Sequence, residues 1–175
     1  NQISKVFTEV PRDLDDFIFA SQTVQAEAKK YFIEFWRTGK PYRNGILWWN
    51  LRDGWPIVSD AITDYYFSKK LAYYYIKRVQ ENAIVAVNDN LGVIGVNDTF
   101  GKVGGKVKIT DIESGKTVFE KTFDIPENGK TEMGKISDLP AYQGMLLIEY
   151  EVDGKKQLNH YLYGKPPFKL SDYKK

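Results

Sequence analysis

The sequence predicts an α+β fold in which a helical first part is followed by an antiparallel β-sandwich, and three observations support this. Apolar residues between positions 13 and 38 recur at helical spacing. After position 83, short runs alternate apolar with polar residues. Turns rich in glycine, proline, asparagine and aspartate separate those runs. The change of period near residues 80–83 therefore divides the chain in two.

The first part is expected to contain two helices with a buried strand between them. One helix is predicted from about residue 14 to 38, because Asp13, Asp15 and Asp16 lie where a helix N-terminus favours negative charge and Gly39 follows its end. The short apolar run 46–51 predicts a buried strand, and a second helix is expected over 68–81. Helix, strand, loop and helix in this order are typical of α/β architecture.

The second part shows the pattern of an immunoglobulin-like sandwich, with six or seven short strands in about 90 residues. Asp153-Gly154 has the composition of a tight hairpin turn. We expect the tail after residue 163 to be extended. The predicted strands cover residues 84–87, 93–96, 107–109, 118–123, 145–150 and 159–163.

Composition narrows the possible functions. The net charge of +2 gives no support for binding nucleic acid or an anionic membrane, and the absence of cysteine excludes thiol chemistry. No apolar run approaches the roughly 20 residues that span a bilayer. His160, the only histidine, has no partner for a metal site, and Gly104-Gly105 does not fit a dinucleotide loop. We therefore expect no metal and no cofactor.

The N-terminus shows no targeting segment and lacks methionine, so a piece of a longer protein is expected.

Tryptophan is concentrated at one place: Trp48, Trp49 and Trp55 lie within eight positions, and Trp36 precedes them. A buried core can use such rings but must satisfy each indole N–H. Sugar-binding clefts use the flat aromatic face against pyranose C–H groups. The residues alone leave both interpretations open.

The stretch "GILWWNLRDGWPIVSDAITDYYFSKKLAYYYIKR" resembles the end of the catalytic barrel of glycoside hydrolase family 2, particularly its β-mannosidase branch. "VIGVNDT" and "NHYLYGKPPFKLSDY" are similar to the C-terminal immunoglobulin-like domain of β-mannosidases. The residues that match the barrel pattern are Gly45, Trp49, Asn50, Leu51, Arg52, Asp53, Trp55, Pro56, Ser59, Asp64, Tyr65 and Lys70.

The resemblance implies that residues 1–82 are the C-terminal end of a (β/α)8 barrel, a terminal helix–strand–helix remnant, and that residues 83–175 form the sandwich domain. The family's two catalytic glutamates lie on earlier barrel strands, one in an Asn-Glu pair that this sequence lacks. We therefore expect no catalytic residue in this chain. The implied partners are a β-linked glycoside or oligosaccharide and the remainder of the parent's barrel, and the implied location of the parent is periplasmic or secreted.

The resemblance also nominates substrate-binding residues. Trp49 lies near the C-terminal end of the predicted strand, which favours a sugar platform over barrel core. Trp48 points the opposite way along an alternating strand and is expected to pack. The full set of candidates is Trp49, Asn50, Arg52, Asp53 and Trp55.

Several alternatives stay open. Arg52 and Asp53 either line the pocket rim or form an ion pair that fixes the loop, and Trp55 with Pro56 either closes the barrel end or contacts sugar. Asn50, Arg52 and Asp60-Ala61 depart from the family pattern, which leaves the sugar and linkage preference undetermined. The chain could also be a stand-alone, non-catalytic carbohydrate-binding or interaction module. Against this, its amphipathic helix would lack a partner, and its second half contains no tryptophan.

Overall fold

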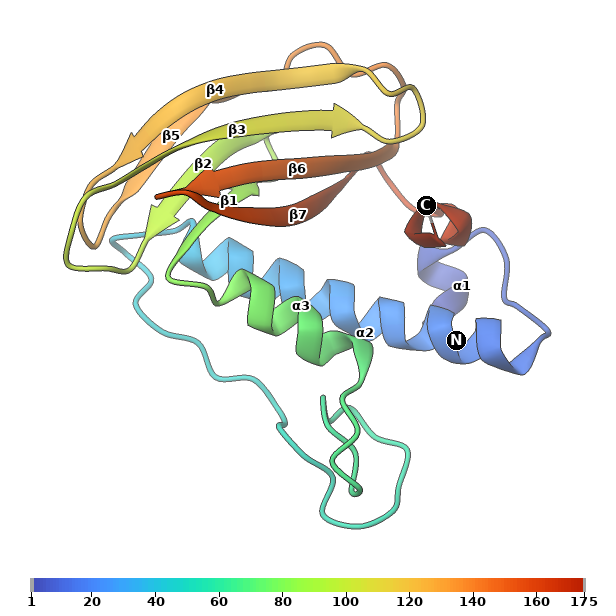
Figure 1. Cartoon of the computed structure of the whole chain (residues 1–175). Helices are drawn as coiled ribbons and strands as arrows, with labels where there is room; N and C mark the ends of the chain where they lie inside the picture. The colour runs from blue at the N-terminus through green and yellow to red at the C-terminus, as the bar shows by residue number, and fades with distance from the viewer. Residues whose placement is uncertain (1, 175) are drawn as a thin grey trace.

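The computed structural model describes residues 2–174 and confirms the α+β class. A layer of helices lies along one side of a β-sandwich (Figure 1). The helices are α1 (Ile3–Val6), α2 (Leu14–Arg37), α3 (Leu71–Val79) and the 3-10 helix η1 (Leu170–Lys174). A long irregular loop joins α2 to α3 and projects away from the sandwich (Figure 1).

Helix α2 forms where its periodicity predicts it. The Asp13 carboxylate accepts hydrogen bonds from the main-chain N–H groups of Asp15 and Asp16, at 3.0 and 3.1 Å. These bonds satisfy N–H groups that have no partner inside the helix. At the C-terminal end of the helix, the Thr38 N–H donates a hydrogen bond to the Glu34 carbonyl at 2.9 Å.

Helix α3 is shorter than the predicted 68–81. Its N-cap residue Lys70 is extended, with φ −75° and ψ 165°, and makes no side-chain cap. The cap comes instead from α2, where the Gln22 side-chain oxygen accepts a hydrogen bond from the Leu71 N–H at 2.8 Å. A tertiary contact therefore sets where this helix begins.

The prediction of a buried strand over residues 46–51 is wrong. A strand exists by pairing its N–H and C=O groups with a neighbouring strand. Among residues 2–174, no strand runs beside this segment. Only isolated bridges join Arg52 to Thr63 and Thr63 to Lys69 further along the loop.

The sandwich consists of two antiparallel sheets, with strand orders β1-β2-β5 and β4-β3-β6-β7. All six predicted runs fall inside these strands, and a seventh, β5, escaped prediction because Met133 is its only buried residue. The bounds are β1 Ala83–Val87, β2 Gly92–Asn97, β3 Val103–Asp111, β4 Thr117–Ile125, β5 Lys130–Lys135, β6 Gly144–Val152 and β7 Lys155–Tyr163.

Two glycine-containing segments are explained by the sheet geometry. The β6–β7 hairpin turns at Asp153 and Gly154, with φ 47° and 81°, which confirms the predicted tight turn. Gly104-Gly105, in contrast, lies inside β3 and not in a turn. A Cβ at Gly105 would collide with the Glu151 carbonyl of the neighbouring β6, so this position requires glycine.

The sandwich core lies between the two sheets and includes the fully buried Ile109, Ile125 and Ile148. Strand β1 is buried along its whole length, so both of its faces are covered. Ile84 and Ile94 belong to a separate apolar cluster outside the inter-sheet core. This second covered face, with the helix layer lying beside β1 and β7 (Figure 1), makes the helices part of one packed body with the sandwich.

The two ends of the chain also meet. The Phe168 N–H donates to the Val6 carbonyl at 2.7 Å, and the Thr8 N–H donates to the Phe168 carbonyl at 3.1 Å. The tail is therefore not simply extended, because it pairs with the segment after α1 and then forms η1. The predicted domain boundary between residues 82 and 83 stays a prediction.

Arg37, the last residue of α2, ties the helices to the sandwich. Its guanidinium donates to the carbonyls of Val79 and Glu81 at 2.5 and 2.8 Å, at the end of α3. It also bonds the carboxylate of Asp98, just after β2, at 2.6 Å. Lys40 pairs with the same carboxylate.

A buried polar cluster joins the C-terminal half of α2 to β7. The Asn159 amide donates to the Glu34 carboxylate at 2.6 Å and to the Val85 carbonyl at 3.1 Å. Lys30 pairs with the other Glu34 oxygen at 2.6 Å. Each buried charge thus has a partner, as burial demands.

His160 lies beside this cluster and contacts the Glu27 carboxylate through Nε2. Burial lowers the pKa of His160 below its ordinary value of 6.5, and the bond to Glu27 offsets only part of that effect. The folded protein therefore holds a neutral imidazole whose Nε2–H donates to the carboxylate. The Tyr75 ring packs edge-on against this imidazole, with the ring centroids 5.2 Å apart, whereas Tyr74 is exposed.

This histidine predicts an acid-sensitive stability. With a folded-state pKa below the unfolded value of 6.5, His160 contributes stability above that pH and loses it as the pH falls. The free energy of unfolding should decrease by up to about 1.4 kcal/mol per pH unit below that point. His160→Gln, which keeps a donor but cannot titrate, should flatten the slope. Urea unfolding between about pH 5 and about pH 8 measures both. Equal slopes in the two proteins would contradict this assignment.

Candidate functional site

The candidate site residues all lie in the loop between α2 and α3, and the loop is held together by pairing of its own main chain. The Ile62 N–H donates to the Asn50 carbonyl at 3.2 Å, and the Thr63 N–H donates to the Leu51 carbonyl at 3.0 Å. The Asp53 N–H returns to the Thr63 carbonyl at 3.1 Å. The segment is therefore ordered by local bonds although it forms no sheet.

Trp48 and Trp49 differ in their exposure. Trp48 is partly buried against the helix cluster that includes Ile33 and Ile76, as predicted for a packing residue. Trp49 is 76% exposed and Trp55 is 64% exposed. The loop thus presents two large aromatic rings whose faces are free to meet a ligand or another part of the protein.

Asp53 supports the loop from inside. It is only 3% exposed; one carboxylate oxygen accepts from the Ser59 hydroxyl, and the other lies 3.1 Å from Lys70 Nζ. The Ser59 hydrogen bond, with Lys70 adding to it, outweighs burial and lowers the pKa of Asp53. The same lysine donates to the Ser59 carbonyl at 3.1 Å. Both oxygens of Asp53 are engaged within the loop.

The ion pair considered between Arg52 and Asp53 does not form, because Lys70 is the partner of Asp53. Arg52 instead donates to the Tyr65 carbonyl at 3.0 Å, and its guanidinium lies 3.7 Å from the centroid of the Phe67 ring. Such stacking suits the planar, weakly hydrated guanidinium. Arg52 is exposed, and these two contacts hold its guanidinium in place.

Asn50 has an unmet hydrogen-bonding capacity. Its side-chain oxygen is buried, and nothing within residues 2–174 donates to it. A buried acceptor without a donor costs about 1–3 kcal/mol. A ligand hydroxyl, or a donor from elsewhere in a larger protein, would relieve that cost.

Carboxylates near the loop are not arranged for chemistry. Asp64, the other acid considered near the predicted strand end, accepts from the Ser68 N–H at 2.7 Å. Glu27 and Glu34 are engaged at the junction with β7. Over residues 2–174, no group of three or more histidine, aspartate or glutamate side chains could hold a metal ion. Within the same residues, no helix has the length and apolar character that crossing a bilayer requires.

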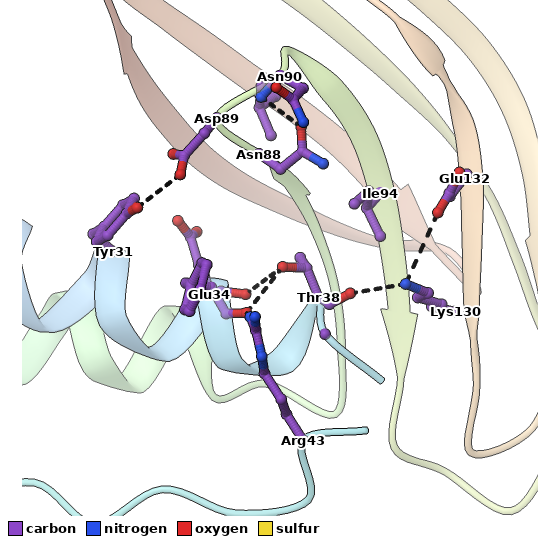
Figure 2. Close-up of a pocket in the computed structure, with 13 residues that line it drawn as sticks. Tyr31, Glu34, Thr38, Arg43, Asn88, Asp89, Asn90, Ile94, Lys130 and Glu132 are labelled. Carbon is purple, nitrogen blue, oxygen red and sulfur yellow. Dashed lines mark hydrogen bonds and ion pairs between the residues drawn. The ribbon is translucent and has the colours of Figure 1, made fainter. Parts of the chain in front are cut away.

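A pocket of about 220 Å³ lies elsewhere, between α2 and the sandwich, and Figure 2 shows its lining. The Tyr31 hydroxyl donates to Asp89 at 2.8 Å across it, and Lys130 donates to the Thr38 carbonyl at 3.1 Å. Arg43 donates to the Phe35 carbonyl at 2.7 Å. None of the five predicted site residues lines this pocket. Its polar groups largely bond one another, as expected at a packing junction.

Sequence reasoning missed the structural roles of Ser59 and Lys70. Both match the family pattern, but they lie six and 17 residues after Asp53 and share no period with it. A serine and a lysine that follow an aspartate in a turn-rich stretch are common. Only the folded loop brings the three together.

Comparisons with known proteins agree with this architecture, although no protein-family model matches the chain. It is 27% identical over 197 residues to β-mannosidase B of Thermothelomyces thermophilus, covering 91% of this chain and 23% of that protein. Over 78 residues it is 38% identical to β-mannosidase B of Aspergillus niger, covering 43% of this chain and 9% of that protein.

Solved structures give the same result. The β-D-mannosidase of Dictyoglomus thermophilum superimposes with a TM-score of 0.78 at 30% identity, covering 95% of this chain and 22% of that one. The exo-chitosanase CsxA of Amycolatopsis orientalis gives a TM-score of 0.77 at 19% identity, which shows the fold alone.

Helix layer, loop and immunoglobulin-like sandwich together therefore have the architecture found in glycoside hydrolases. More narrowly, the predicted resemblance to the C-terminal portion of family 2, β-mannosidase-like proteins is confirmed. The chain spans 23% of the first of these relatives and 22% of the first solved structure.

Asp53 and its partners predict a loop that loosens when the ion pair is removed. Lys70→Met keeps the side chain's length but leaves the Asp53 carboxylate without its cation. We expect chymotrypsin to cleave the loop several-fold faster, with the new sites mapped by mass spectrometry. The control is Lys69→Met. This neighbouring lysine is exposed, and its ammonium lies over the Tyr73 ring and not beside Asp53. Equal cleavage of the Lys70→Met and Lys69→Met variants would show that the ion pair between Asp53 and Lys70 does not support the loop.

Proposed function

We propose that the intact protein containing this chain is a retaining exo-β-glycosidase of the β-mannosidase type. In this proposal residues 1–82 supply the end of its barrel and residues 83–175 an accessory sandwich. The observation that supports it most is the similarity over 91% of the chain to a β-mannosidase B. The exposed tryptophans on an internally braced loop agree with that similarity.

The proposed substrate contacts are exposed groups of the loop together with the buried Asn50 side-chain oxygen, which has no donor among the described residues. Trp49 offers a flat apolar face for the C–H groups of a pyranose ring, and Asn50 and Arg52 offer polar groups for its hydroxyls. Trp55 adds a second exposed ring. In this scheme Asp53 acts from within the loop, since Ser59 and Lys70 occupy its carboxylate.

The proposed ligand is a β-linked glycoside or oligosaccharide, and the other partner is the remainder of the barrel. Retaining hydrolysis needs two carboxylates about 5–5.5 Å apart, one to attack the anomeric carbon and one to protonate the leaving oxygen. Asp53 and Asp64 of the loop are tied to Ser59, Lys70 and Ser68. The catalytic pair is therefore proposed to come from the rest of the intact protein, which is proposed to work in the periplasm or outside the cell.

A second candidate is a non-catalytic carbohydrate-binding module that works alone. The exposure of Trp49 and Trp55 favours it, because two aromatic faces can bind sugar without any catalytic group. The two candidates differ in one respect. A module should bind sugar as this chain by itself, whereas a barrel fragment should need the remaining strands to complete the cleft.

The tryptophan pair tests the proposed platform. In the intact enzyme, Trp49→Ala should lower kcat/KM at least about tenfold, equivalent to about 1.4 kcal/mol of lost transition-state binding. Trp48→Ala, the matched control, should mainly lower the melting temperature. Truncating a fully buried ring costs about 3–5 kcal/mol of stability, and the loss should be smaller here because Trp48 is only partly buried. Steady-state kinetics and thermal unfolding of both variants measure this. Equal kinetic effects with unchanged melting temperatures would show that the two faces are assigned wrongly.

The chain by itself is predicted to hydrolyse no glycoside. Purified chain should release no p-nitrophenol from p-nitrophenyl β-mannoside, β-galactoside, β-glucuronide or β-glucosaminide, because Asp53 and Asp64 are held in structural bonds and no matched carboxylate pair is expected in this chain. Turnover that disappears in Asp53→Asn would make the chain an enzyme in its own right.

A further inference from the structure

Three side chains on one face of α2 form hydrogen bonds with main-chain groups of the loop. The Gln22 side chain accepts from the Leu71 N–H at 2.8 Å, where the loop enters α3. The Gln25 amide donates to the Asp60 carbonyl at 2.5 Å. Lys29 Nζ donates to the Trp49 carbonyl at 2.5 Å.

The three residues, Gln22, Gln25 and Lys29, form a row on the helix. Positions 22, 25 and 29 are three and four apart, the separations that place side chains on the same face of an α-helix. They contact the end, the middle and the beginning of the segment from Trp49 to Leu71. Because the partners are main-chain groups, these three contacts occupy none of the loop's side chains.

Lys29 is the member of the row closest to the proposed platform. Its ammonium lies 5.2 Å from the centroid of the Trp48 ring while it bonds the Trp49 carbonyl. Burial lowers the pKa of Lys29, and the charge of Asp60 opposes that shift. A charged donor in such a partly desolvated place makes a stronger hydrogen bond than a neutral one.

The Trp49 ring has little else to fix it. It is 76% exposed, so the peptide that bears the indole sets the point from which the ring projects. That peptide is held by Lys29 at the Trp49 carbonyl and, one residue later, by the Ile62 N–H at the Asn50 carbonyl. Removing the lysine bond would leave the platform attached on one side only.

We propose that Lys29 is a positioning residue for substrate binding: by holding the Trp49 carbonyl, it fixes the main-chain position from which the indole projects to receive the sugar. This inference rests on the proposed function of Trp49. Lys29 itself touches no reacting atom and acts only through the main chain of Trp49.

The test uses the intact enzyme and a β-mannoside substrate. Lys29→Met keeps an apolar stem against Trp48 but removes the ammonium, and we expect kcat/KM to fall about tenfold. Lys29→Arg, which can still donate to the same carbonyl, should recover most of that loss. Lys77→Met is the matched control, because Lys77 is an exposed lysine on α3, and it should leave kcat/KM unchanged.

A double-mutant cycle separates positioning from general support. In a Trp49→Ala background there is no ring to orient, so Lys29→Met should have almost no further effect on kcat/KM. If the loss is the same in both backgrounds, or if Lys29→Met lowers only the melting temperature, the positioning role is excluded. If Trp49→Ala itself leaves kcat/KM unchanged, the platform proposal fails. If Trp49→Ala lowers kcat/KM while Lys29→Met does not, only the role of Lys29 fails.

Discussion

The arrangement of the whole chain depends on how Arg37 ends helix α2. The last carbonyls of α3 have no partners inside that helix and attract positive charge. Arg37 donates to those of Val79 and, just beyond, Glu81, while its second amino group bonds Asp98 beside the sandwich. One side chain therefore joins the ends of both helices to the β-structure. Lys40 and Lys130 reinforce the same corner through Asp98 and the Thr38 carbonyl.

With α2 fixed against the sandwich, its remaining faces can serve different purposes. One face buries Glu34 and Glu27 against β7, where Asn159 and His160 satisfy them. Another supplies Gln25 and Lys29 to the main chain of the loop. The loop is thus positioned from the helix without using its outward side chains. This division explains how an irregular segment can present exposed tryptophans in a defined place.

The elements with a clear local period could be predicted from the sequence. Helix α2 and the strands that alternate apolar with polar residues formed where expected, whereas β5 did not stand out because only Met133 is buried. The run 46–51 has the composition of a buried strand, but strand formation requires a neighbour that the described residues do not contain. The composition of a segment thus predicts its tendency, and its partners decide the outcome.

The candidate site shows the same limit. The position of the tryptophan cluster follows from the sequence, and the packing of Trp48 agrees with the prediction, although the alternating strand on which that prediction rested does not form. The partner of Asp53 does not, because Lys70 lies 17 residues away and Arg52 is adjacent. Nor do the contacts of Gln25 and Lys29, since a bond to main chain leaves no pattern in the residues contacted. Long-range bonds of this kind appear only once the chain is folded.

The measurement that tests this account most directly is a crystal structure of the intact protein with a mannose-configured inhibitor bound. The account predicts that the sugar ring stacks on the Trp49 indole and that Lys29 Nζ still bonds the Trp49 carbonyl, as it does here. It also predicts that both catalytic carboxylates come from outside these 175 residues. A Trp49 ring buried between barrel strands, with the sugar bound elsewhere, would contradict it.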